Sequence, residues 1–522
     1  MNKYHKTKNV QACLLGYKAL KKSGNMSLVK TIKNKLVDTC VFKEGYKVSS
    51  FFFKLDSHRA EIVIRQFLSS RLLNLSFNKA LLISIGSNNP IIYPLPKEWQ
   101  HALIKSGIDV STKYCSLLWY LFGWKMLLNG IFFFIKYTAQ SFLGVIYKSS
   151  EKTEKFVYFS GLTKSNLPKS SSDNKSYNLI NWYLARNPKG NEINSLCHDV
   201  HGVEAFKIGN ANIGYLKYPF LPISDFTNLI KCFLWSFLAV FYATFNIARN
   251  NIWCAVILKE VIFTEIFRRQ HSKALASEYM FHEWIYRPLW TYEAERKGSK
   301  IILYLYSINN GSERAEIEYD WRLSNWPDYL VWDDYSENFI KSAVYSYSKI
   351  HIVGPIWFSS GGKIENIPKD SISVFDVSPF QEDIYVILGE TDERYVPKYV
   401  NKFLNDIHSV LKKNNITMAH KRKRHNPKIH KEYLKNIGKL KKQKKYIEAD
   451  CELSPLEVIK KTKACISMPF TSTALIAKHD GKPSVFYDPN GLTQIDEKVM
   501  NGIPILTSID ELQQWIEEVN KV

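Results

Sequence analysis

The sequence predicts an α/β protein with two Rossmann-like parallel-sheet units that follow a mostly helical region. Three observations lead to this prediction. A chain of 522 residues is too long for a single hydrophobic core. From about residue 155 onward, short apolar runs that suit buried strands alternate with helical patterns. Before residue 150 there are helical fragments and no such alternation.

The first unit is expected to begin with the apolar run at 156–159. Further strands are predicted at 300–306, 329–332 and 349–353, with helices at 288–297 and 337–345. Strands that alternate with helices imply a parallel sheet. Gly354, Pro355 and the Ser-Ser-Gly-Gly run at 359–362 then break the pattern. We therefore place a boundary near 355–368, which divides the chain into residues 1–150, 151–362 and 363–522.

The second unit has the clearer pattern. Pro397 can begin a helix, because its missing N–H costs nothing at the first position. An apolar stripe follows on one face of that helix. Ser508 and Glu511 have the spacing of a capping box that begins the last helix. The residues expected on the buried side of this helix are Leu512, Trp515, Ile516 and Val519. Strands are predicted at 372–377, 416–419, 464–467, 484–487 and 503–506, and helices at 427–440, 455–461 and 471–478.

Two successive α/β units joined by a linker are typical of a GT-B-like architecture. In that architecture a nucleotide binds in the cleft between the units, at the carboxyl ends of the second sheet's strands. The eight cysteines form no Cys-x-x-Cys pair and no metal-type spacing, which favours a reducing compartment. The apolar run near residues 13–15 is too short for a signal sequence, so we expect a cytoplasmic protein.

Two strongly apolar stretches bear on membrane contact. Residues 114–147 are interrupted by Lys125 and Lys136, and the 17 uncharged residues 232–248 lie between Lys231 and Arg249. A spanning helix needs roughly 18–20 uninterrupted apolar residues. The stretches suit buried core helices, interfacial helices that insert aromatic residues among lipid headgroups, or true spans. We predict peripheral association with an anionic membrane surface, at the inner face of the cytoplasmic membrane, without a span.

The run from Ser467 to Ala474 is the first candidate site. A strand ends at Ser467, Pro469 and Phe470 form a turn, and the hydroxyl residues Thr471, Ser472 and Thr473 open a helix. The N–H groups at a helix start bind anions, and hydroxyl groups add donors suited to phosphate. Ordinary N-capping by Thr471 or Ser472 explains the same residues. The position after a central strand favours phosphate binding.

The second candidate is a basic tract. Residues 412–445 hold 14 lysines and arginines against one acid, Glu432. Lys421, Lys423 and Arg424 directly follow a predicted strand, so they are expected to neutralise a nucleotide phosphate. The net charge of +22 also suits polyanions. No nucleic-acid-binding motif accompanies the charge, so we expect no nucleic-acid partner.

The run from 469 to 491 resembles the bacterial polysaccharide biosynthesis PFTS-motif proteins, with the motif at Pro469, Phe470, Thr471 and Ser472. Weaker similarity lies at 421–424, 375–377 and 403–404, and it extends to the regions 166–183 and 329–333, so the resemblance covers about residues 155–500. The family looks distantly similar to GT-B sialyl- and Kdo-type transferases, which use CMP-activated sugars. Those enzymes often carry a Lys/His-Pro element, where this chain has the basic run 420–427.

The resemblance implies a glycosyltransferase that transfers a nucleotide-activated sugar, preferably CMP-linked, to a lipid-linked or growing glycan of a capsule or O-antigen. Two alternatives stay open: a CDP-alditol-type phosphotransferase on the same fold, and a non-catalytic membrane-docked scaffold. Asp488, in the loop after a predicted strand, is a candidate contact to the ribose or base.

Glycosyl transfer needs a base that deprotonates the acceptor hydroxyl. Candidates in the first unit are Asp333, which is ranked first, together with His282 and Glu283. No Asp-x-Asp motif stands in the context of a metal-dependent transferase, so neither an essential metal nor another cofactor is expected.

Overall fold

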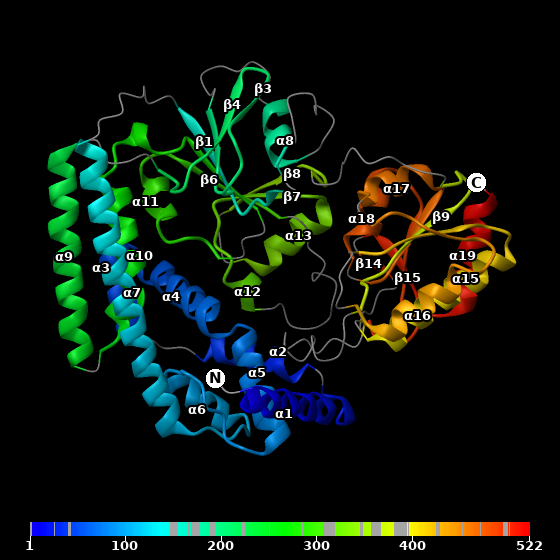
Figure 1. Cartoon of the computed structure of the whole chain (residues 1–522), viewed down its shortest axis with the longest axis horizontal. Coiled ribbons are helices and arrows are strands. Elements are labelled where there is room, and N and C mark those ends of the chain that lie inside the picture. The colour runs from blue at the N-terminus through cyan, green and yellow to red at the C-terminus, as the bar shows by residue number, and fades with distance from the viewer. Residues whose placement is uncertain are drawn as a thin grey trace.

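The computed structural model places helices and two parallel sheets along most of the chain (Figure 1). It describes residues 3–521 except 26, 40–42, 147–154, 165–166, 169–177, 187–194, 221–224, 250, 283–285, 306–318, 345–347, 357–366, 380–393, 395, 424–428, 452, 470, 494–498 and 501.

The N-terminal region is helical, as predicted, and it leads into one long apolar helix, α7. Asp56 and Asn74 cap two of the shorter helices by accepting hydrogen bonds from backbone N–H groups. The helices are α1 (Lys3–Lys22), α2 (Leu28–Asp38), α3 (Lys43–Phe53), α4 (Ser57–Leu72), α5 (Leu75–Ser87), α6 (Lys97–Lys105) and α7 (Thr112–Ile146).

The first sheet has eight strands in the order β3-β4-β2-β1-β5-β6-β7-β8. All neighbouring pairs are parallel except β3 with β4. Its strands are β1 (Phe156–Ser160), β2 (Ser195–His198), β3 (Phe206–Ile208), β4 (Ala211–Tyr215), β5 (Glu278–His282), β6 (Lys300–Tyr304), β7 (Asp328–Val331) and β8 (Lys349–Ile352).

Two long helices leave this unit and pack on the N-terminal region. α9 (Phe226–Ala248) and α10 (Trp253–Arg269) pack on each other and on α7. In Figure 1 the three lie together along one edge of the molecule. The shorter elements of the unit are α8 (Leu179–Arg186), the 3-10 helix η2 (Ser272–Ala274), α11 (Thr291–Arg296), α12 (Tyr319–Arg322) and α13 (Asp334–Ala343).

The second sheet has seven strands in the order β11-β10-β9-β12-β13-β15-β14. Its six longer strands are parallel, and only the two-residue strand β14 is antiparallel to its neighbour. The strands are β9 (Ile372–Phe375), β10 (Met418–Lys421), β11 (Tyr446–Glu448), β12 (Ala464–Ser467), β13 (Ser484–Tyr487), β14 (Val499–Met500) and β15 (Ile503–Leu506).

Amphipathic helices cover this sheet. The stripe predicted after Pro397 is confirmed, because its apolar members are all buried. The predicted capping box of the last helix forms in part: the Ser508 hydroxyl accepts from the Glu511 N–H, but the Glu511 carboxylate accepts from Thr507 instead of Ser508. The helices are α15 (Pro397–Lys413), α16 (Lys431–Leu440), α17 (Pro455–Lys461), α18 (Ser472–His479) and α19 (Ile509–Lys521).

The structure confirms the predicted fold class, an α/β protein with two parallel sheets and a helical N-terminal region. The strands of the two sheets lie within residues 156–352 and 372–506. The point predicted for the boundary falls partly on 357–366, outside the described residues, so the division at 362 stays a prediction. The two units touch where the Lys478 ammonium lies 4.8 Å from the centre of the Tyr335 ring.

The interpretation of the two apolar stretches as buried core helices is wrong. Thr112–Ser141 and Phe226–Ala248 are long and apolar enough to cross a membrane, yet only 22% and 28% of their most apolar windows are buried. Six large apolar side chains of α7 and seven of α9 are exposed. One side of each helix therefore faces outward.

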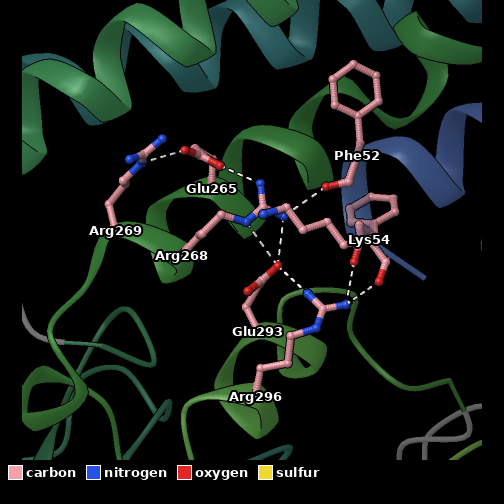
Figure 2. Close-up of polar contacts among 8 residues, drawn as sticks. Phe52, Lys54, Glu265, Arg268, Arg269, Glu293 and Arg296 are labelled. Atoms are coloured by element: carbon pink, nitrogen blue, oxygen red, sulfur yellow. Dashed lines mark hydrogen bonds and ion pairs between the residues drawn. The ribbon is translucent and has the colours of Figure 1, made fainter. Parts of the chain in front are cut away.

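A buried cluster of ion pairs joins the N-terminal helices to the first unit (Figure 2). Arg268 on α10 donates to Glu265 (2.6 Å) and to Glu293 on α11 (2.7 Å). Glu265 is fully buried and Glu293 is 5% exposed at the side chain. Arg269 donates to the second oxygen of Glu265 (2.7 Å), and Arg296 pairs with Glu293. Every buried charge drawn in this cluster therefore has a partner.

The same arginines close the end of α3. Arg268 donates to the Phe52 carbonyl (2.9 Å), and Arg296 donates to the carbonyls of Phe53 (2.7 Å) and Lys54 (2.8 Å). The last carbonyl groups of a helix have no partner within the helix, so they need such donors. The cluster thus holds α3, α10 and α11 in one arrangement.

We predict that Glu293→Gln lowers the free energy of unfolding by about 1.5–3 kcal/mol, because it removes a buried charged partner of Arg268 and Arg296 while Arg268 keeps its pair with Glu265. Chemical denaturation followed by circular dichroism measures the change. The matched control is Glu337→Gln, which removes the more exposed pair of Glu337 with Lys341 and should cost less than about 1 kcal/mol. Equal effects of the two substitutions would show that the cluster does not hold the helices in place.

Candidate functional site

The strand order of the second sheet marks one position for ligand binding. From the central strand β9, the chain proceeds to β10 and β11 on one side and then to β12, β13 and β15 on the other. This is the Rossmann order, and its topological switch point lies between β9 and β12. Ligands bind such sheets outside the carboxyl ends of the two strands at that point.

The predicted hydroxyl residues lie directly at the switch point. Ser467, the last residue of β12, pairs in register with Phe375 at the end of β9. Its hydroxyl is 2.7 Å from the Thr473 hydroxyl, and Thr471 donates to the Met468 carbonyl (2.7 Å). These bonds fix the turn between strand and helix.

This turn ends at the start of α18. Thr471 occupies the N-cap position, but its side chain makes no capping hydrogen bond. Simple N-capping by Thr471 is therefore not what its hydroxyl does. Ser472, half-buried at the first helical position, makes no side-chain hydrogen bond to any described residue. The first N–H groups of α18 are thus available to an anion.

A buried carboxylate organises the other side of the switch point. Asp376 follows β9 and accepts four hydrogen bonds: its Oδ2 from His420 Nε2 (3.0 Å) and the Tyr433 hydroxyl (2.6 Å), and its Oδ1 from the N–H (3.0 Å) and hydroxyl (3.1 Å) of Ser378. The other ring nitrogen of His420 lies 2.8 Å from the Tyr446 hydroxyl. This network locks the loop after β9 to β10, β11 and α16.

The pKa of Asp376 reflects these partners. Burial alone would raise its pKa, but the facing His420 and the hydrogen bonds from His420, Tyr433 and Ser378 hold the pKa below its usual value. Asp376 is therefore a permanent anion at neutral pH. Ser378 follows with φ +48°, a left-handed conformation that the paired carboxylate keeps in place.

The predicted basic residues follow β10. Lys421 is buried, and its ammonium donates to the carbonyls of Cys451 (3.0 Å) and Arg422 (3.3 Å). Lys423 is exposed, and its N–H donates to the Ser378 hydroxyl (3.2 Å), which ties it to the loop after β9. Arg424 lies outside the described residues. Arg422, which the sequence analysis did not select, pairs with Glu448.

The remaining residues predicted to bind the nucleotide donor are Pro469, Phe470 and Asp488. Pro469 is buried, and Phe470 lies outside the described residues. Asp488 is fully buried; its carboxylate accepts from the Tyr399 hydroxyl (2.8 Å) and from the N–H groups of Asn490 (3.3 Å) and Thr493 (2.7 Å). These three bonds hold the loop after β13.

The first sheet has the same strand order around β1, and its switch point lies between β1 and β5. His282 is the last residue of β5 and is buried. Burial lowers the pKa of His282 to about 4, against a hydrogen bond with the Gly161 backbone that acts in the opposite direction. His282 is therefore neutral at neutral pH. Glu283 lies outside the described residues.

Asp333 lies two residues beyond the end of β7 and is half-buried. Its carboxylate accepts from the Ser336 N–H (2.8 Å), so it is the N-cap of α13. Tyr304, at the end of β6, stands between Asp333 and His282 in strand order and stacks on the His282 ring with centroids 5.9 Å apart.

The sequence analysis missed part of this edge. Asp199, directly after β2, accepts from the Ser160 hydroxyl (2.9 Å) and the Gly161 N–H (3.0 Å), and so shapes the turn after β1, where Gly161 has φ +84°. His198, which precedes Asp199, is fully buried, and burial lowers its pKa. Both were missed because β2 was not predicted.

Comparison with protein families finds one match: the model described as "Polysaccharide biosynthesis PFTS motif protein" matches residues 233–516, more than half of the chain. The match begins later than the resemblance predicted near residue 155. A search of curated proteins finds no match.

Three solved structures illustrate the structural similarity. The UDP-GlcNAc 2-epimerase of Methanocaldococcus jannaschii, in complex with UDP-GlcNAc and UDP, is 12% identical, with 51% of this chain and 74% of that chain covered and a TM-score of 0.30. TarM is 10% identical, with 50% of this chain and 52% of TarM covered and a TM-score of 0.30, so this chain spans about half the length of TarM. The wall teichoic acid polymerase TagF is 12% identical, with 77% of this chain and 89% of that chain covered and a TM-score of 0.37.

We predict that Asp376→Asn destabilises the protein most above the ordinary aspartate pKa of about 3.9. Because the pKa of Asp376 is lower in the folded state, its contribution to stability is fully present above that value and is lost as pH falls through the folded-state pKa. The difference in unfolding midpoint between wild type and variant should therefore be constant from pH 5.5 to 8 and shrink below pH 4.

Denaturation at a series of pH values gives this difference. Glu518→Gln, at an exposed position on α19, is the matched control and should show no comparable loss. A difference that grows as the pH falls would contradict the assignment of Asp376 as the buried anion.

Proposed function

The chain belongs to the family of polysaccharide biosynthesis PFTS motif proteins, and on that premise we propose that it is a GT-B-type glycosyltransferase that uses a nucleotide-activated sugar to build a bacterial surface polysaccharide. The observation that carries the proposal is the position of the family's motif. Thr471 and Ser472 open α18 at the switch point of a Rossmann-ordered sheet, where such sheets bind nucleotide phosphates.

The donor's phosphate would lie at the start of α18. The helix dipole, the uncapped N–H groups and the Ser472 hydroxyl supply donors, and Lys423 and Arg424, which follow β10 in the sequence, supply positive charge. Positive charge beside the phosphate also stabilises the nucleotide as it departs. The donor we propose is CMP-linked, as in the transferases that the motif resembles.

The acceptor would bind at the corresponding edge of the first sheet, across the proposed cleft. Its hydroxyl needs a base. Asp333 is half-buried and ionised carboxylates can accept that proton, whereas His282 is buried behind the Tyr304 ring. We therefore assign the base to Asp333. A capsule or O-antigen glycan on a lipid carrier, at the inner face of the cytoplasmic membrane, is the acceptor we propose.

Two substitutions test the donor site. Arg424→Ala should weaken nucleotide binding by about 1.5–3 kcal/mol, because it removes a charge-assisted contact, and Ser472→Ala by about 0.5–1.5 kcal/mol, because it removes a neutral one. Calorimetric titration with CMP and with other nucleotides measures both effects and identifies the preferred base.

Two further variants serve as controls. Ser484→Ala removes a hydroxyl at the opposite edge of the same sheet, and Lys439→Ala removes a charge from the exposed side of α16. Neither should change the affinity. If Arg424→Ala and Ser472→Ala also left it unchanged, the start of α18 would not be the donor site, and binding of no nucleotide at all would favour a scaffold.

Asp333→Asn separates catalysis from capping. Asparagine is as good an N-cap as aspartate, so the variant should keep the thermal stability of the wild type. It cannot act as a base, so the rate of sugar transfer should fall by about 10²–10⁴-fold. Product analysis by mass spectrometry follows the reaction and distinguishes a transferred sugar from a phosphoalditol. Full activity of Asp333→Asn would show that Asp333 only caps α13.

A further inference from the structure

The outward sides of α7 and α9 form a continuous apolar surface, which we call the α7–α9 face. The two helices pack side by side, with the rings of Phe134 and Phe233 stacked at 5.4 Å. Thirteen large apolar side chains on this face are 47–64% exposed. They are Tyr114, Leu117, Leu121, Leu128, Phe132 and Ile135 on α7, and Phe226, Leu234, Phe237, Leu238, Phe241, Tyr242 and Phe245 on α9.

The spacing of these residues makes the face regular. On α7 they follow one another at intervals of three, four and seven residues, and on α9 the residues from Leu234 to Phe245 alternate between intervals of three and one. Such spacing places them on one side of each helix. Soluble monomers rarely expose so large a contiguous apolar surface, which marks an interaction site.

The charges within the two helices all have one sign, and the exposed Asp225 caps the start of α9. Neither helix contains an aspartate or glutamate. The exposed basic residues are Lys113, Lys125 and Lys136 on α7, Lys231 in the second turn of α9, and Arg249 at the C-cap of α9. The Arg249 guanidinium lies 4.0 Å from the centre of the Phe245 ring. An apolar surface bordered by cations complements a bilayer with anionic headgroups, since lysine stems can lie along apolar groups while their ammonium groups reach the phosphates.

The contacts on the inner side of α7 and α9 determine how the two helices can lie relative to a membrane. α10 runs along α7, so closely that a Cβ at Gly123 or Gly130 would lie within 3.0 Å of Ile252 or Leu258. The same α10 carries the buried Glu265 and its partner Arg268, whose bonds to Glu293 and to the Phe52 carbonyl join α10 to α11 and α3. A helix pair that crossed the bilayer would carry these charges and the attached sheet into hydrocarbon, at great cost. The helices must therefore lie parallel to the membrane.

A second copy of the chain fits the face less well. Lys125 stands among Leu121, Leu128 and Phe132 on the outward side of α7. In a symmetric dimer built on this face, the lysines of both copies would be buried together with no acid from α7 or α9 to pair them. Lipid phosphates supply the missing counter-charge.

We propose that the α7–α9 face binds the surface of an anionic lipid bilayer, with both helices parallel to the membrane and only their outward sides among the lipids. The inference identifies the surface behind the proposed membrane association. It does not depend on glycosyl transfer, and its test uses neither donor nor acceptor, so the two can fail separately.

Vesicle sedimentation with the full-length protein tests the proposal. The protein should bind vesicles of phosphatidylcholine with phosphatidylglycerol more tightly than vesicles of phosphatidylcholine alone. Leu238→Glu with Phe241→Glu should reduce binding at least tenfold. The control variant, Leu434→Glu with Ile509→Glu, introduces two acids at exposed apolar positions elsewhere. Its affinity for anionic vesicles should fall by no more than the added negative charge alone predicts. Equal losses in both double variants would overturn the proposal.

A second pair of variants tests the charges. Lys125→Ala with Lys231→Ala should lower affinity for anionic vesicles by about fivefold per lysine and leave the weak binding to neutral vesicles unchanged. Lys413→Ala with Lys439→Ala removes the same net charge from the second unit and should have a much smaller effect. Circular dichroism melting checks that each variant is folded. If the two double lysine variants bound anionic vesicles with the same affinity, the assignment of the face would be overturned.

Two measurements test the orientation. A fluorophore attached in turn at Leu117→Cys, Leu128→Cys and Ile135→Cys should be quenched equally by lipids brominated at one depth, because a parallel helix keeps one depth along its length. Carbonate washing should release the protein from membranes. Graded quenching, or protein that resists the wash, would mean that α7 crosses the bilayer. A dimer in sedimentation velocity without lipid, made monomeric by Leu238→Glu with Phe241→Glu, would assign the face to self-association.

Discussion

The buried ion cluster of Glu265, Glu293, Arg268 and Arg296 is the constraint on which the first half of the structure depends. Its arginines bind the last carbonyls of α3, and its carboxylates belong to α10 and α11. Carboxylates so deeply buried are costly unless they are paired, so the three helices have one compatible arrangement. The hydrophobic residues of the N-terminal helices and of one side of the first sheet accordingly form one continuous core. The helical region is therefore a fixed part of the first α/β unit.

The second half depends in the same way on one carboxylate, Asp376. With His420, Tyr433 and Ser378 it connects the ends of two adjacent strands to α16. The loops after β9 and β10 are thus held in place by buried groups. The two halves share a strand order but differ in chemistry at the switch point: neutral histidines and Asp199 at one, hydroxyl groups and lysines at the other.

The elements that the sequence predicts well are those whose side chains face one way along the whole element. The helix after Pro397 is one, because its apolar stripe covers the sheet from end to end. The strands β2, β3 and β4 escaped prediction, because they lie toward the edge of the sheet and are only partly buried. A half-exposed strand of three to five residues leaves no apolar run to recognise.

The candidate site divides in the same manner. The turn at 467–473 can be found from the sequence, because strand, proline and hydroxyl residues are contiguous. The contacts of Asp376 cannot, because His420 and Tyr433 are 44 and 57 residues away and only the pairing of β9 with β10 brings them together.

The α7–α9 face has one more consequence. A protein held flat on a bilayer meets lipid-anchored molecules by lateral diffusion in two dimensions, and its rigid link to the first sheet keeps that sheet at one height above the headgroups. Chain length and anchor geometry would then select which lipid-linked glycans can reach it.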